Sequence, residues 1–341
     1  MDQTQLTFQE TNLWDTPIRD LGLTIEGTRL EPIVADFLRE LDARGIRLRP
    51  RFYLSSEWGV PFETISIAIP FYLADPELMK LHRERVGVIE GLDRDDVLRY
   101  LRHEMGHVMN YAYRLYDTEE WVKLFGSISQ PYEDDYTPQP FSRRHVRHLP
   151  GWYAQKHPDE DWSETFAVWM TPGLDWYADY RAWPVALAKL KYCDRIIARV
   201  RDTAPIVTDD ALDEDVAEIA YTLEDFYDDA EDLRDELPPG IDGALRAIFR
   251  DFTRRQADAQ QPLMPAATLL RRLERDLMSS VFRWTGHFPE RTSLLVRHLA
   301  ERATTLGLGY DASREDQARV AVTTFVTALA MNFIHRGAYL P

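Results

Sequence analysis

Two histidines four residues apart, with a glutamate directly after the first, are the residues of this sequence best placed to do chemistry. They are His103, Glu104 and His107, in a segment of the form HExxH. On an α-helix, His103 and His107 lie one turn apart on the same face, so their imidazoles can converge on one metal ion. Glu104 lies one step round the helix, where it can take a proton from a metal-activated water. The spacing therefore predicts the zinc site of a hydrolase.

The residues around this motif favour a helix with one buried face. Apolar side chains recur at helical spacing, at Leu98, Leu101, Met105, Val108, Ala112 and Leu115. The two histidines and Glu104 lie off that stripe. Gly106 costs a helix about 1 kcal/mol relative to alanine, so we expect another backbone or a metal to approach closely there. We predict a helix from Asp93 to Leu115, and the alternative is that the two histidines are ordinary surface or core residues.

A third protein ligand is needed to complete such a site. A third histidine at the metzincin spacing would fall at position 113, which is Tyr113, so that class is excluded. Further along, Pro158 and Asp159 are typical of a helix start, and the residues after them keep helical apolar spacing. A glutamate from a second helix completes the gluzincin pattern. We therefore predict Glu164 as the third ligand, with His157 as an alternative.

Two supporting roles remain to be filled at this site. Asp161 lies one turn before Glu164 on the same helix face, and it could accept the second ring N–H of a ligand histidine. Catalysis also needs a hydrogen-bond donor for the developing oxyanion. We predict Tyr153 for that role. The alternatives are His148, His157, Tyr177 and Tyr180.

The HEMGH segment and the segment HPDEDWSETFAVW, which starts at His157, together resemble the putative zinc-binding metallopeptidases. These form a largely uncharacterised bacterial group of gluzincin type, with a looser likeness to the lethal-factor-like peptidases. The resemblance covers about residues 50–195. It implies that His103, His107 and Glu164 bind zinc. It also implies that Glu104 is the general base. Gluzincins often carry an acid one turn after the ligand glutamate, but here that position is Val168, and the role passes to Asp161.

The expected fold class is α+β. Residues 1–200 should form a zinc metallopeptidase-like domain, in which a small gluzincin-like sheet accompanies the zinc helix and the helix that bears Glu164. Strands are expected at 46–54 and 64–70, where apolar residues alternate. The second strand is a candidate sheet edge for binding a substrate backbone, or else a plain internal strand. Residues 201–341 should form an all-α domain, with helices at about 211–236, 241–257, 265–284, 290–306 and 313–336.

The charge distribution restricts the possible partners. A net charge of −17 argues against binding to nucleic acid or to anionic lipid. Residues 209–236 hold fourteen acidic residues and one arginine. The basic cluster at 143–148 could bind this acidic segment or a substrate carboxylate, or it could be a solvated surface. We expect a protein partner, if there is one, to bind through the C-terminal helical domain.

The sequence favours a cytoplasmic protein without a membrane anchor. Met1–Leu6 shows neither the basic nor the apolar region of a secretory signal. The apolar run from Val320 to Ile334 is short for a bilayer span, and we expect a buried helix there. The single cysteine, Cys193, cannot form an internal disulfide.

The function predicted from these features is that of a zinc-dependent metallopeptidase that hydrolyses peptide or amide bonds in a peptide or protein substrate. One alternative is a protease specialised for one partner, or for tailoring a peptide product, with the acidic segment in recognition or self-inhibition. Another is a non-catalytic zinc-binding interaction protein. Structural zinc sites usually have four protein ligands and use cysteine, whereas this sequence offers three ligands and a glutamate placed as a base.

Overall fold

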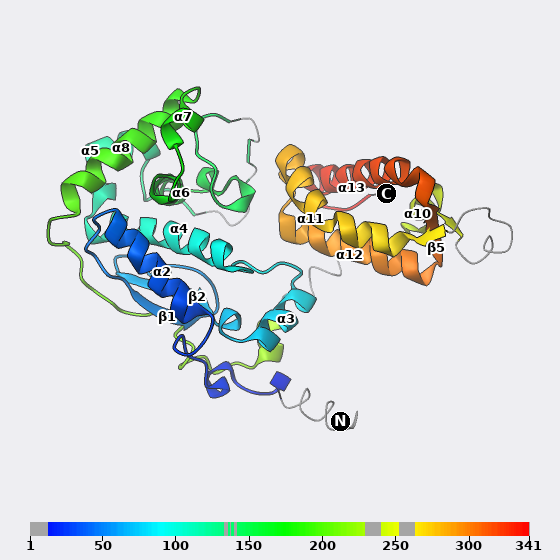
Figure 1. The fold of residues 1–341 in the computed structure, drawn as a ribbon, viewed down its shortest axis with the longest axis horizontal. Coiled ribbons are helices and arrows are strands. Elements are labelled where there is room, and N and C mark those ends of the chain that lie inside the picture. The colour runs from blue at the N-terminus through cyan, green and yellow to red at the C-terminus, as the bar shows by residue number, and fades with distance from the viewer. Residues whose placement is uncertain are drawn as a thin grey trace. The chain divides into compact units, whose positions relative to one another are not determined.

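The fold is described from a computed structural model, which covers residues 13–132, 136, 138–139, 142–228, 240–251 and 263–340. The chain divides into two compact units (Figure 1). The first comprises Met1–Arg83 and Ile89–Phe226, and the second comprises Glu84–Val88 and Tyr227–Pro341. Helices predominate in the described residues, and small sheets accompany them. The predicted α+β class is confirmed.

The first unit contains the elements that hold the HExxH segment. In chain order they are η1 (Ile18–Leu21), α2 (Leu30–Ala43), β1 (Arg51–Ser55), β2 (Ser66–Pro70), η2 (Phe71–Ala74), α3 (Pro76–Arg85), α4 (Arg94–Ala112), η3 (Leu115–Asp117), α5 (Glu119–Phe125), η4 (Pro150–Gln155), α6 (Pro158–Met170), α7 (Trp176–Tyr180) and α8 (Pro184–Val200), where η marks a 3-10 helix. Helix α4 contacts α2, β2 and α6. It therefore lies at the centre of this unit (Figure 1).

The sheet of the first unit is a pair of parallel strands. Arg51 of β1 pairs with Ser66 of β2, and the register runs on to Ser55 and Pro70. Every residue of β2 is buried, and the Ala68 N–H donates a hydrogen bond to the carbonyl of Gly59. The Gly59 segment thus covers part of the edge of β2 that β1 leaves open, which argues against this edge as a binding site for a substrate backbone.

Helices α4 and α6 approach each other closely, and this contact positions the candidate site. A Cβ atom on Gly106 would lie 2.6 Å from the Cα of Ser163, so glycine is required by a close backbone approach, as the sequence indicated. The indole N–H of Trp162 donates to the carbonyl of Gly106 at 2.8 Å. Asp93 caps the start of α4, and α6 begins at Pro158. Both helix starts agree with the prediction.

The segment after α8 packs on the first unit instead of forming a long helix. The N–H groups of Ile206 and Val207 donate to the carbonyl of Ala112, and that of Val216 donates to Leu54. Residues 211–222 are not helical, whereas 223–228 are. The predicted helix at 211–236 is therefore wrong over its first part, because these backbone groups bond to the first unit, and residues 229–236 lie outside the described residues. This segment is predicted to belong to the second domain, but it belongs to the first unit as far as Phe226.

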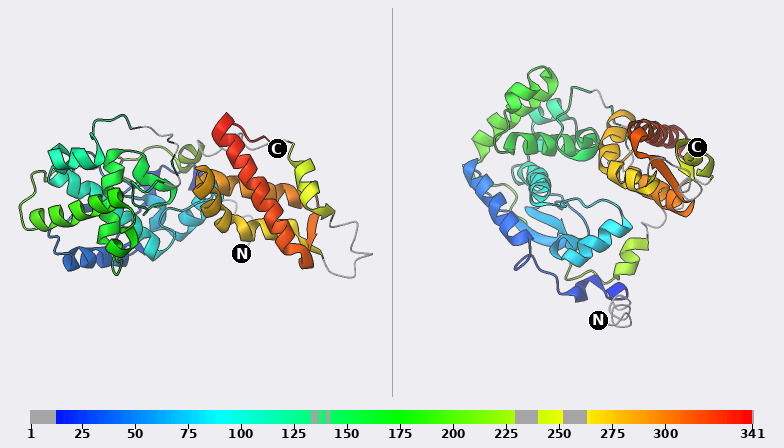
Figure 2. Two further views of the ribbon diagram at one scale, coloured as in Figure 1. Left: turned by 90° about the horizontal axis from the view of Figure 1, so that it is seen from above. Right: turned by 45° about the vertical axis from the view of Figure 1, so that its right-hand side comes forward.

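The second unit packs three long helices around a core of its own. Its elements are α10 (Asp242–Ile248), β3 (Arg250–Asp251), β4 (Leu263–Pro265), α11 (Ala266–Thr285), α12 (Pro289–Thr305), β5 (Leu308–Asp311), η5 (Ala312–Arg314) and α13 (Glu315–Arg336). Helices α11, α12 and α13 lie side by side (Figures 1 and 2). Strand β5 pairs antiparallel with both β3 and β4. The expectation of an all-α domain is corrected by this small sheet.

One helix of the second unit meets a compositional test for a membrane span. By length and composition alone, the helical residues Ala312–Arg336 could cross a membrane. A core helix of a soluble protein passes the same test, so this is weak evidence. The face of α13 that carries Val322, Val326 and Leu329 is buried in the core of the second unit.

Candidate metal centre

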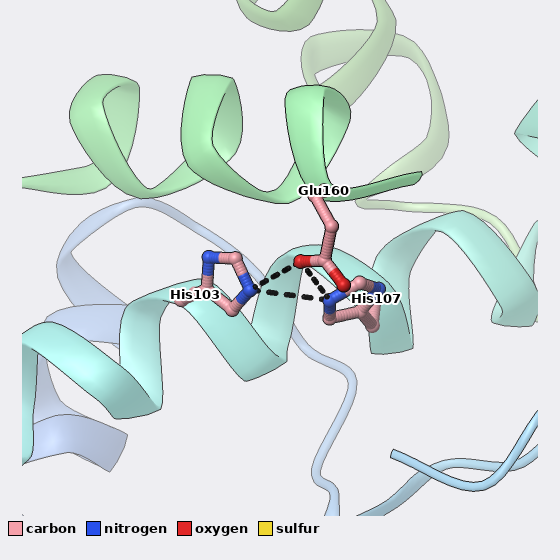
Figure 3. A group of neighbouring side chains, drawn as sticks. All are labelled: His103, His107 and Glu160. Carbon is pink, nitrogen blue, oxygen red and sulfur yellow. Dashed lines mark hydrogen bonds and ion pairs between the residues drawn. The ribbon is translucent and has the colours of Figure 1, made fainter. Parts of the chain in front are cut away.

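Three donor atoms converge where α4 meets the first turn of α6 (Figure 3). Nε2 of His103 lies 2.9 Å from Oε2 of Glu160, Nε2 of His107 lies 3.3 Å from the same oxygen, and the two Nε2 atoms are 3.2 Å apart. All three residues are buried, and their donor atoms lie within 4.8 Å of one another. Two imidazoles and one carboxylate at this separation can hold a single transition-metal ion.

The far side of each imidazole is held by another carboxylate of α6. Nδ1 of His103 lies 3.0 Å from Oε1 of Glu164, and Nδ1 of His107 lies 2.9 Å from Oδ2 of Asp159. Each contact favours the tautomer with the proton on Nδ1, which leaves Nε2 free to bind a metal. The second contact that metal-binding histidines usually need is therefore present for both rings.

Glu164, which the sequence analysis predicted as the third ligand, lies behind His103 and not among the donor atoms. Its carboxylate also accepts the backbone N–H groups of His148 and Leu149 at 3.0 to 3.1 Å. The donor position is taken by Glu160, one turn earlier on α6. The two glutamates share a helix face, so the sequence pattern fits either one. The crossing of α6 over Gly106 decides which of them reaches the histidines.

Asp159 is a part of the site that the sequence analysis treated only as a helix-start residue. It accepts hydrogen bonds from Nδ2 of Asn110 at 2.6 Å and from the hydroxyl of Tyr111. Asp161, which was expected to hold a ligand histidine, instead accepts a hydrogen bond from the buried Nζ of Lys189. Tyr111 follows His107 by four positions, so the sequence places it on the same helix face as the histidine, where its hydroxyl reaches Asp159.

Glu104 is buried in α4, between the two histidines in sequence. Burial raises its pKa above the ordinary value, and the nearby charges of His103 and His107 oppose that shift. A carboxyl group with a raised pKa both accepts and releases a proton more readily near neutral pH. Glu104 thus lies near both histidines, and its role as a base stays a prediction.

Two tyrosines cover the donor atoms from the side of η4 and the loop before it. The ring of Tyr153 packs on that of His103 at 5.6 Å between centroids. The hydroxyl of Tyr132 donates to Oε1 of Glu160 at 2.8 Å and lies 3.2 Å from the hydroxyl of Tyr153. Burial and the charge of Glu160 raise the pKa of both hydroxyls, so they stay protonated and can donate. Tyr153 stays the predicted oxyanion donor, and Tyr132 beside it is not among the residues expected from sequence.

The other residues considered as oxyanion donors serve different purposes. Nε2 of His148 donates to the carbonyl of Arg99, and His157 caps the start of α6. The hydroxyl of Tyr180 accepts the N–H of Arg147, and Tyr177 is exposed on α7. These contacts position the surrounding chain. The basic cluster at 143–148 therefore lies partly against the site's supporting structure.

The histidines and carboxylates of the candidate centre shift one another's pKa values. Burial alone would lower the pKa of His103, but hydrogen bonds with Glu160 and Glu164 raise it to about 9. Burial likewise opposes the shift of His107, whose pKa Asp159 and Glu160 raise well above its ordinary value. Against its own burial, the charge of His107 holds the pKa of Glu160 well below the ordinary range. The site is thus an anionic pocket that favours a cation.

Two histidines one helical turn apart and a carboxylate from a second helix form a donor set that could hold a divalent metal ion. Residues 69–197 match the model of a family described as "Putative zinc-binding metallo-peptidase". The family resemblance inferred from the sequence is thereby confirmed over this segment, which includes α4 and α6.

Curated relatives match a shorter part of the chain. One from Mycobacterium bovis and two from Mycobacterium tuberculosis are each 33% identical to it over 100 residues, and each is named an uncharacterized protein. The aligned part makes up 26% of this chain and 28% of each relative. The chain thus spans little more than a quarter of the length of these relatives. No solved structure matches it.

Proposed function

We propose that this protein is a zinc-dependent metallopeptidase that hydrolyses peptide or amide bonds. The observation that carries the proposal is the convergence of His103, His107 and Glu160 within 4.8 Å, with the buried Glu104 close to both imidazoles. The family description of residues 69–197 supports the same chemistry. The proposal replaces Glu164 by Glu160 as the third ligand.

The donor set fits zinc. Two imidazole nitrogens and one carboxylate oxygen match the three-ligand sets of catalytic zinc sites, in which a fourth position stays open for water or substrate. His103, His107 and Glu160 would hold the ion. When bound, zinc lowers the pKa of a water molecule and polarises the carbonyl to be attacked. Asp159 and Glu164 hold the two imidazoles by their Nδ1 atoms and so fix the direction of each Nε2.

Glu104 is the proposed general base. Its carboxylate takes the proton of the attacking water and then delivers it to the nitrogen of the leaving amine. The raised pKa of this buried group suits both steps. Its place directly after His103 in α4 keeps it within the same rigid element as two of the ligands.

The oxyanion donor is proposed to come from the two tyrosines beside the site. Tyr153 packs on His103, and its hydroxyl lies 3.2 Å from that of Tyr132. Tyr132 in turn binds the free oxygen of Glu160. A neutral hydroxyl there can donate to a negative oxygen as it develops. Tyr153→Phe should therefore lower kcat more than it changes zinc content.

The ligand assignment is tested by elemental analysis of zinc in the wild type, Glu160→Ala and Glu164→Ala. Glu218→Ala is the control, since Glu218 is an exposed acid of the same unit. We expect one zinc per chain in the wild type and in the control, and very little in Glu160→Ala. Loss of the Nδ1 partner in Glu164→Ala should weaken zinc binding roughly 10- to 100-fold. Full zinc content in Glu160→Ala, with none in Glu164→Ala, would restore the assignment made from sequence.

Hydrolysis is tested with a library of internally quenched peptides and the zinc-loaded wild type. Cleavage that a chelator removes and added zinc restores is the expected result. Zinc bound without any cleavage would favour the alternative of a non-catalytic zinc-binding protein. Cleavage of a few peptides only would favour a protease of narrow range.

A further inference from the structure

Phe62 is an exposed aromatic residue in the connection between β1 and β2. It is 60% exposed, although its ring lies 5.1 Å from that of Tyr111 and 5.8 Å from that of Tyr116. Both tyrosines are buried, and their rings are 6.3 Å apart. We call these three residues the Phe62 cluster. One face of the cluster is therefore an apolar surface in contact with water.

The Phe62 cluster adjoins the candidate metal centre on its more accessible side. The ring of Tyr111 lies 6.0 Å from that of His107, and its hydroxyl donates to Asp159, which holds Nδ1 of His107. The His107 side chain is 10% exposed, whereas that of His103 is 2% exposed. The Phe62 cluster therefore lies beside His107, which is the more exposed of the two imidazoles.

The backbone holds Phe62 in place at an energetic cost. Glu63 has φ 57° and Arg114 has φ 46°, a left-handed conformation that side chains other than glycine rarely adopt. These two residues form an ion pair at 3.0 Å, and Glu63 also accepts the hydroxyl of Tyr116 at 2.5 Å. Strain of this kind persists only where the surroundings fix it, and it gathers at functional sites. An exposed phenylalanine on such a turn is a positioned side chain.

We propose that the Phe62 cluster is a specificity subsite that binds a large apolar side chain of the substrate next to the scissile bond. The inference rests on the proposed peptidase function and adds the substrate class to it. Aromatic side chains should bind best, because they can pack edge-to-face on Phe62. Burial of the exposed ring by the substrate removes apolar surface from water on both partners.

The test compares kcat/KM for quenched peptides that differ only at the positions flanking the cleaved bond, with phenylalanine, leucine, alanine or aspartate there. Wild type, Phe62→Ala and Phe62→Leu are assayed with zinc bound. Val122→Ala is the matched control, since Val122 is an exposed apolar residue on α5 of the same unit. Zinc content and thermal melting are measured for each variant.

We expect the wild type to prefer phenylalanine over alanine at one flanking position by about tenfold or more. Phe62→Ala should remove most of that preference while leaving the alanine peptide cleaved at a similar rate. Phe62→Leu should keep the preference for leucine and lose part of that for phenylalanine. Val122→Ala should behave as the wild type.

Other outcomes would overturn the inference in distinguishable ways. The proposed subsite would be refuted if the wild type cleaved peptides without apolar preference, or if Phe62→Ala left the preference unchanged. Either result would leave the proposed peptidase function intact. A zinc-loaded wild type that cleaves no peptide sinks the proposed function, and the subsite falls with it.

Discussion

Each unit of this chain buries a histidine that uses both ring nitrogens, but the partners differ. In the second unit, His287 is fully buried, with Nδ1 2.7 Å from the hydroxyl of Thr292 and Nε2 2.7 Å from that of Tyr339. In the first unit, His103 lies between the carboxylates of Glu160 and Glu164. Burial lowers the pKa of His287 to about 4, whereas the carboxylates raise that of His103 to about 9.

The difference shows that burial of an imidazole does not by itself indicate a metal site, and that the charge of its partners decides whether a cation is favoured. Hydroxyl partners satisfy a neutral ring, so His287 joins the end of α11 to the C-terminal segment and needs no cation. Carboxylate partners leave negative charge that only a proton or a metal ion can balance. The surroundings of the two histidines of α4 therefore favour a cation, whereas His287 is satisfied by hydroxyl partners in the core.

The largest effect is expected at the base. Glu104→Gln should reduce kcat roughly 10²- to 10⁴-fold, because the amide cannot take the proton of the attacking water. The zinc content should remain that of the wild type, since Glu104 is not a proposed ligand. Peptide cleavage and elemental analysis on the same preparation check both statements. A variant with wild-type kcat would refute the proposed role of Glu104.

A second prediction concerns the pH dependence of zinc binding. The raised pKa values of His103 and His107 mean that, near neutral pH, each imidazole of the metal-free protein should hold an extra proton that zinc must displace. Because zinc binding to both imidazoles displaces two protons, the affinity for zinc should fall by up to roughly a hundredfold per pH unit as the pH is lowered from 8 to 6. Competition with a chromogenic chelator at several pH values measures it. An affinity that does not change over this range would show that His103 is not protonated in the free site.

The raised pKa of His103 also predicts how the stability of the metal-free protein changes with pH. A histidine with a raised pKa stabilises the fold fully below its ordinary pKa of about 6.5, and this contribution is lost as pH rises through about 9. Metal-free protein should thus melt at lower temperature at pH 9 than at pH 6.5 in its first unit. Added zinc should reverse this trend.

A third prediction concerns His287. His287→Ala would leave the buried hydroxyls of Thr292 and Tyr339 without this partner, at a cost of about 2–4 kcal/mol in the stability of the second unit. Zinc content and peptide cleavage should not change. Chemical denaturation and elemental analysis check the two parts. If the variant lost zinc while its first unit stayed folded, the separation between a packing histidine and a metal-binding histidine would fail.

The helices of the site were predictable from sequence, but the contacts between them were not. Apolar periodicity and the Asp93 and Pro158 signals predicted α4 and α6. The choice between Glu160 and Glu164 depends on where α6 crosses α4. The two glutamates are four positions apart and lie on the same helix face, so helical periodicity cannot distinguish them. Gly106 indicated that another segment approaches α4 closely, but the sequence does not show which residue that is.

Elsewhere, long-range contacts overrode local preference. Residues 211–222 have an acidic, helix-like pattern, yet Val216 bonds to Leu54 and Ile65 bonds to Asp209 across the first unit. The segment Leu308–Asp311 lies between the predicted helices at 290–306 and 313–336, yet it forms the central strand of the second unit's sheet. Such pairings depend on residues distant in sequence, which local patterns do not reveal.

The smallest effects come from a matched pair of helical glycines, one in each unit. In α4, a Cβ atom on Gly106 would lie 2.6 Å from the backbone of Ser163, whereas in α10 a Cβ on Gly243 would meet nothing within 4 Å. Gly106→Ala should therefore destabilise the first unit by about 1–3 kcal/mol and weaken zinc binding, because it pushes α6 and Glu160 away from the histidines. Gly243→Ala should stabilise the second unit by up to about 1 kcal/mol through helix propensity. Denaturation curves and zinc content for both variants make the measurement. Equal effects of the two substitutions would mean that the close approach of α4 and α6 does not set the geometry of the centre.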